Sequence, residues 1–192
     1  MYHMAVRITD YLIKHKVVSM NVREEYIYGF EILTGKIINY GTLLGLAYLN
    51  GNLIPTIFFM FVFFSLRGQT GGYHCKHTLS CYLCTWIIYM MIWIIPPLLL
   101  QSRYIIVTVS ILSTMIILLV APVNHPNLRL SNEEIFICRR FSRRITLLII
   151  TGIFISLWLN VIHVSVLYAA TALAMDAGLL VIAKFIKQEV SG

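Results

Sequence analysis

The chain has 192 residues, of which 59% are hydrophobic and only 12% are charged, and its mean hydropathy is +0.82. Soluble domains carry about 25% charged residues, so this composition excludes a water-exposed globular domain. The net charge of +7 comes from basic residues beside apolar segments, which argues against nucleic acid as a partner and for a lipid membrane.

The N-terminal segment, residues 1–32, mixes apolar residues with Arg, Lys and Glu and lacks a long apolar run. We expect it to lie on the membrane surface as an amphipathic segment. Long apolar runs follow, separated by the turn signal Asn50-Gly51-Asn52 and by polar stretches at 67–78 and 122–144. The expected spans are 33–50, 53–66, 79–100, 104–121, 145–160 and 165–186.

Unbroken apolar runs predict helices, because a backbone that crosses lipid must satisfy its hydrogen bonds within the segment. We therefore expect an all-α fold, a polytopic membrane helical bundle of about six transmembrane helices with an N-terminal interfacial amphipathic segment. Residues 1–192 form a single integral membrane domain in this interpretation, with 1–32 interfacial and 33–192 in the bundle.

The basic residues indicate the orientation of the bundle. With six spans, the stretches 67–78 and 122–144 fall on the same side as both termini, and these parts are rich in Arg and Lys. The connections on the other side carry only Arg103. The positive-inside rule therefore predicts that both termini and the His- and Cys-rich stretch are cytoplasmic.

The stretch Arg67–Cys84 carries the most reactive residue types in the chain. We expect a helix to begin near Thr78, which places Cys81 in its first turn, where the positive end of the helix dipole stabilises a thiolate. A histidine beside such a cysteine takes the thiol proton and returns it to the leaving amine. This pairing is typical of an acyl-transfer site.

Two His–Cys pairs have the same spacing, because His74 precedes Cys81, and His77 precedes Cys84, by seven residues. Seven residues of continuous helix rise about 10.5 Å, so a dyad requires the histidine to lie in the preceding loop. Gly71-Gly72, just before His74, supplies backbone freedom for that loop. The pattern modestly favours His74 with Cys81.

The same four residues suggest an alternative, a zinc site with ligand pairs His74-x2-His77 and Cys81-x2-Cys84. Zinc modules usually place a longer loop between ligand pairs, which disfavours a metal. The corresponding alternative function is a small membrane carrier or channel with a cytoplasmic metal or thiol site. Asp176, inside the last span, is thin support for such a transport path. Cys84 is better explained by packing within a helix than by a role in chemistry.

Two motifs resemble a known family. One runs from Arg67 through Gly71-Gly72-Tyr73-His74 to Cys81, and the other is Ala121-Pro122-Val123-Asn124-His125-Pro126-Asn127, followed by Glu133-Glu134. Together with the order of spans, they resemble the accessory gene regulator B (AgrB) family, the membrane cysteine peptidases of Gram-positive peptide quorum sensing.

The resemblance implies that His74 and Cys81 are catalytic and that no cofactor or metal takes part. It implies cleavage of the C-terminal tail of an AgrD-like autoinducing-peptide precursor. The acyl-enzyme thioester is then captured by a Cys or Ser of the precursor to give a cyclic thiolactone or lactone. It also implies a homodimer in the plasma membrane of a Gram-positive bacterium.

Several further residues are expected to support this site. Gln69, Thr70 and Asn124 are candidates for orienting the histidine, by location and residue type. Arg67, Gly71 and Gly72 belong to the motif itself. A basic group is expected to attract an acidic precursor tail; its members are Arg139, Arg140, Arg143 and Arg144. The positive-inside rule explains the same charges without a substrate.

Overall fold

A computed structural model describes residues 2–73, 78–124, 130–161 and 163–187; at 78, 79, 81 and 82 it describes the backbone. The described residues form seven α-helices and one short 3-10 helix, with no strand among them. The elements are α1 (Tyr2–Lys14), η1 (Met20–Val22), α2 (Arg23–Leu49), α3 (Leu53–Thr70), α4 (Thr78–Leu100), α5 (Arg103–Val120), α6 (Asn132–Trp158) and α7 (Val164–Phe185). Six of these helices are long and apolar enough to cross a membrane, which confirms the all-α polytopic bundle.

The helices differ in extent from the predicted spans. The second helix begins at Arg23 rather than near residue 33, and α3 continues to Thr70 rather than ending near 66. α6 begins at Asn132, well before the predicted 145, so the arginine cluster lies on a helix rather than in a loop. A capping box explains this early start: Ser131 accepts a hydrogen bond from the Glu134 N–H, and the Glu134 carboxylate accepts one from the Ser131 N–H.

The chain divides into two compact units, Met1–Leu49 and Asn50–Gly192. In the first unit, α1 packs against α2. Its buried side includes Ala5 and Thr9, which are one helical turn apart. Arg23 at the start of α2 forms a salt bridge with Asp10 of α1 at 2.9 Å. This partly exposed pair connects the start of α2 to the second half of α1.

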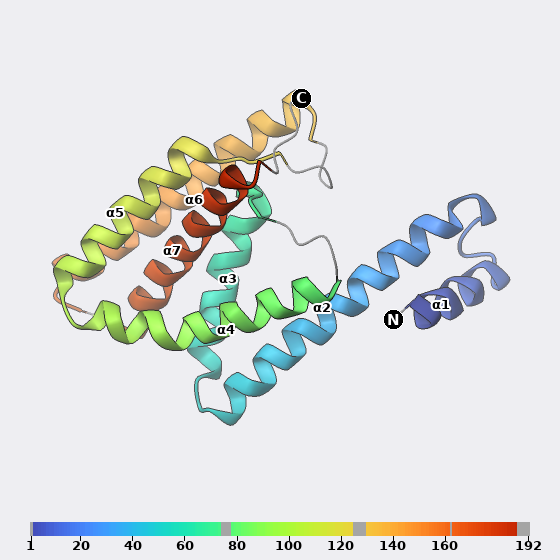
Figure 1. The fold of residues 1–192 in the computed structure, drawn as a ribbon, viewed down its shortest axis with the longest axis horizontal. Helices are drawn as coiled ribbons and strands as arrows, with labels where there is room; N and C mark the ends of the chain where they lie inside the picture. Colours follow the sequence, from blue (N-terminus) through green and yellow to red (C-terminus); the bar gives the residue numbers. More distant parts are fainter. Residues whose placement is uncertain (1, 74–77, 125–129, 162, 188–192) are drawn as a thin grey trace. The chain divides into compact units, whose positions relative to one another are not determined.

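The second unit is built around α7, which contacts α3, α4, α5 and α6 (Figure 1). Buried residues make up 67% of the apolar stretch of α7, against at most 33% in any other candidate span. Its buried face is rich in small side chains, which allow neighbouring helices to approach closely. The small residues buried on this helix are Ala169, Ala170, Ala172, Ala177 and Ala183.

Candidate active site

α4 begins at Thr78, as expected, and Cys81 therefore lies in its first turn. The side chain of Cys81 and the whole of His74 lie outside the described residues, as do Cys75 and His77. The structure does describe the segments that lead into this region. These are residues 67–73, residues 121–124 and the second half of α7.

The chain turns back over the end of α3 and is held there by Arg67. The Arg67 guanidinium donates hydrogen bonds to the carbonyl groups of Gly71 and Tyr73. Gly71 and Gly72 both have positive φ angles, +69° and +90°, which side-chain-bearing residues rarely adopt. A Cβ atom on Gly72 would lie 2.3 Å from Arg67 Nη1. The two glycines therefore form a tight, fixed turn just before His74.

The second motif lies directly beside this turn. Val123 donates its N–H to the Thr70 carbonyl at 2.9 Å, and Gly71 and Val123 form an isolated parallel bridge. A Cβ atom on Gly71 would lie 2.3 Å from the Val123 carbonyl oxygen, so a glycine is required. The two motifs, distant in sequence, thus form one structural feature.

Asn124 follows this bridge and is buried. Its side-chain amide donates to the Leu130 carbonyl at 3.2 Å, and its carbonyl oxygen accepts from the Leu130 N–H at 3.0 Å. Asn124 therefore ties together the two ends of the segment 125–129. Its described hydrogen bonds serve the backbone of this connection. Whether it also orients the histidine stays a prediction.

α7 supplies the third support of the turn. Thr70 donates its hydroxyl to Asp176 Oδ1 at 3.0 Å, and both side chains are completely buried. The Tyr73 N–H donates to the Leu179 carbonyl at 3.2 Å. Sequence reasoning did not include Asp176 in the site, although a carboxylate inside a span is itself a signal of function.

Gln69, the other residue expected to support the histidine, lies half-buried on the last turn of α3. Within the described part of the chain it joins none of the hydrogen bonds that hold the turn. The structure brings Arg67, Gly71 and Gly72 together and leaves Gln69 at the edge of the group.

The four arginines of the predicted recognition group are all exposed on the first half of α6. The guanidinium of Arg140 lies 4.8 Å from the centre of the Phe136 ring, a cation–π contact. Among the described residues, the ion pairs are those of Arg23, so these four positive charges have no carboxylate partner there. They form one basic face on α6.

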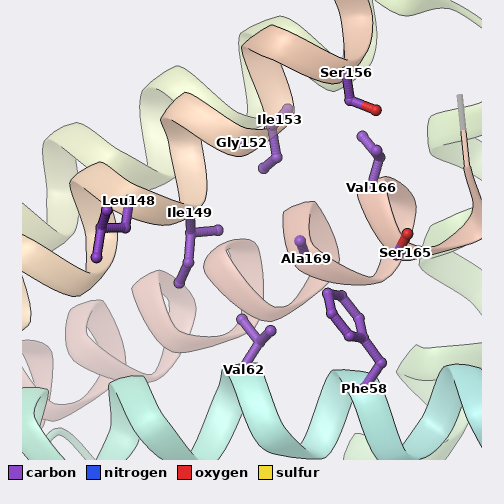
Figure 2. A pocket seen from close by; sticks show the side chains of 10 residues that line it. All are labelled: Phe58, Val62, Leu148, Ile149, Gly152, Ile153, Ser156, Ser165, Val166 and Ala169. Carbon is purple, nitrogen blue, oxygen red and sulfur yellow. The ribbon is translucent and has the colours of Figure 1, made fainter. Parts of the chain in front are cut away.

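The structure also contains a cavity of about 290 Å³ between α3, α6 and α7 (Figure 2). Its lining is largely apolar and includes Phe58 and Val62 of α3, with Ser156 and Ser165 as its hydroxyl groups. Val62 precedes Gly71 by nine residues, so at 1.5 Å per residue the cavity lies roughly 14 Å or more along α3 from the turn. It is therefore separate from the candidate active site.

No group of three potential metal ligands occurs among the residues that the structure describes. His74 and His77 of the alternative zinc site fall outside them. The zinc alternative stays untested by the geometry.

The model of the family Accessory gene regulator B matches residues 5–182. No curated protein and no solved structure matches the chain. The match spans nearly the whole chain, including the Arg67–Tyr73 turn, Val123 and Asp176. The chain therefore belongs to the accessory gene regulator B (AgrB) family, whose members take part in processing the autoinducer of agr quorum sensing.

Proposed function

We propose that this chain is a membrane-embedded cysteine endopeptidase that removes the C-terminal tail of an AgrD-like precursor and cyclises the remaining peptide. The observation that carries the proposal is the position of Cys81 in the first turn of α4, after a turn held by Arg67 and two glycines. Family membership supports the class of substrate.

The proposed reaction has two acyl transfers. His74 takes the proton of the Cys81 thiol, and the thiolate attacks the scissile carbonyl. The C–N bond breaks, the tail leaves as an amine with the proton from His74, and a thioester remains on Cys81. A thiol or hydroxyl of the precursor then attacks the thioester. This step closes the thiolactone or lactone ring and releases Cys81 as a thiol.

The helix start contributes to both steps. The positive end of the α4 dipole favours the thiolate, and the unpaired N–H groups of the first turn are suitable donors for the oxyanion. Water competes with the internal nucleophile for the thioester, so exclusion of water from the site favours cyclisation over hydrolysis.

The proposal extends to the setting of the enzyme. Residues 1–192 act as one peptidase unit in the plasma membrane of a Gram-positive bacterium, with both termini and the active site cytoplasmic. The basic face of α6 attracts the acidic tail of the precursor. The active enzyme is a homodimer.

Co-expression with an AgrD-like precursor tests the proposal. Cys81→Ala and His74→Ala each abolish cleavage, measured by mass spectrometry of the precursor fragments. Cys84→Ala and His77→Ala are the matched controls and retain most of the activity. Full cleavage by Cys81→Ala would rule out the proposal that the chain is a cysteine peptidase with Cys81 as its nucleophile. A purified protein that holds a metal and loses it on substitution of Cys81 and Cys84 would favour the carrier or channel instead.

A further inference from the structure

Asp176 is a carboxylate in the middle of the most buried helix of the chain. It is completely buried, and Oδ2 accepts no hydrogen bond from the residues that the structure describes. Ionisable groups within membrane spans are costly and are kept mainly where they serve a function. The presence of a carboxylate at this buried position therefore requires an explanation beyond packing.

The hydrogen-bond partner of Asp176 lies on the last turn of α3. Thr70 donates to Asp176 Oδ1 at 3.0 Å. Arg67 lies three residues before Thr70, on the same face of the helix. Asp176 is thus hydrogen-bonded to the helical turn of α3 that also carries Arg67.

Both of these side chains belong to residues that hold the turn before His74. Arg67 donates to the carbonyl groups of Gly71 and Tyr73, and the Thr70 carbonyl accepts from the Val123 N–H. A change at Asp176 therefore reaches the second motif through Thr70, on the helical turn that also carries Arg67. The backbone contact from Tyr73 to Leu179 attaches the same turn to α7 one helical turn further along.

We propose that Asp176 is a positioning residue of the peptidase, which holds the Arg67–Tyr73 turn against α7 through Thr70. This inference rests on the proposed function, because the turn leads directly into His74. Asp176 acts through other residues. Misplacement of a reacting group by about 1 Å can cost a hundredfold in rate, so loss of this attachment lowers kcat.

Thr70→Val is the sharpest test, because it removes the hydroxyl and keeps the shape of the side chain. Cleavage of the precursor by the full-length enzyme in membranes is expected to fall about ten- to a hundredfold in kcat, with KM nearly unchanged. Thr70→Ser keeps the hydroxyl and restores most of the rate. Asp176→Leu removes the oxygen that accepts from the Thr70 hydroxyl and lowers kcat in the same way.

Thr171→Val provides a matched control. Thr171 is as buried as Thr70, but its hydroxyl donates only to the Leu167 carbonyl of its own helix, at 2.8 Å. This variant is expected to cleave at the parent rate. Equal losses in Thr70→Val and Thr171→Val would overturn the proposal, because they would reflect removal of any buried hydroxyl.

Alkylation of Cys81 by iodoacetamide, followed peptide by peptide in a mass spectrometer, gives a second measurement. A displaced histidine leaves the thiol less activated, so alkylation of Cys81 slows in Thr70→Val and is restored in Thr70→Ser. An unchanged alkylation rate together with an unchanged kcat in Thr70→Val contradicts the inference. This measurement uses Thr70 variants, so it holds even if Asp176→Leu does not fold.

Cys81→Ala in the same assay separates the two proposals. Cleavage by Cys81→Ala would mean that the proposed function itself fails. Loss of cleavage in Cys81→Ala, with parent rates in both Thr70→Val and Asp176→Leu, would leave the peptidase in place and exclude only the positioning role.

Discussion

At the scale of single residues, the turn at Gly71 and Gly72 tolerates the fewest side-chain types. Gly71→Ala introduces a Cβ that would lie 2.3 Å from the Val123 carbonyl oxygen, at a φ of +69°. An alanine in this conformation costs about 1–3 kcal/mol, and Val123 must also move. We expect Gly71→Ala to lower cleavage strongly and to reduce the melting temperature of the purified protein.

Gly68→Ala is the control for this substitution. Gly68 lies on the same helix, α3, and an added Cβ would meet no atom within 4 Å. In a helix, alanine is favoured over glycine by up to about 1 kcal/mol, so the protein should be no less stable. Cleavage by Gly71→Ala at the parent rate would show that activity does not depend on this conformation of the turn.

Sequence reasoning identified the residue types of the site better than their roles. The motif resemblance selected Arg67, Gly71 and Gly72, and the structure brings these three together. The glycines were expected to give freedom, whereas they allow one fixed turn. The contact from Thr70 to Asp176 joins residues 106 positions apart. No local pattern encodes such a pair, because it depends on how α3 packs against α7.

At the scale of helices, the start of α6 depends on a local signal. Glu134 completes the capping box with Ser131, whereas its neighbour Glu133 makes no such hydrogen bond in the described structure. Glu134→Ala and Glu133→Ala each remove one negative charge from the first turn, so they share any effect on the helix dipole. Only Glu134→Ala breaks the box.

We therefore expect Glu134→Ala to destabilise the protein more than Glu133→Ala. Thermal unfolding in detergent measures the difference between the two variants. Equal melting temperatures would mean that the capping box does not determine where α6 begins. The hydropathy pattern missed this start, because a polar, arginine-rich first half looks like a loop when only apolar runs are counted.

At the scale of the whole molecule, hydropathy was sufficient to predict the number of candidate spans and the fold class. It could not predict that α7 is the helix about which the second unit packs, because α4 and α5 are at least as apolar. The difference lies in side-chain size. The alanines of α7 permit close contacts on several sides, which a hydropathy profile does not register.

The role proposed for the basic face of α6 also belongs to this scale, because electrostatic attraction of a substrate depends on the summed field of many charges. Replacement of Arg139, Arg140, Arg143 and Arg144 by Gln should lower kcat/KM for an acidic-tailed precursor about tenfold at low ionic strength. The loss should appear mainly in KM and should shrink as salt is added, since salt screens exposed charges. Replacement of the same four residues by Lys keeps the charge and should retain most of the activity.

The Lys variant also separates recognition from topology. Both substitutions are assayed in nanodiscs, after the protein has inserted, with the orientation of each variant checked by labelling of its termini. One outcome is that the Gln variant inserts in the parent orientation and shows the parent kcat/KM at every salt concentration. That result would mean that the four charges set topology alone and do not attract the substrate. Arg103→Gln, at the start of α5 on the predicted opposite side, should leave the salt dependence unchanged, because a screened charge that far from the basic face cannot attract the tail.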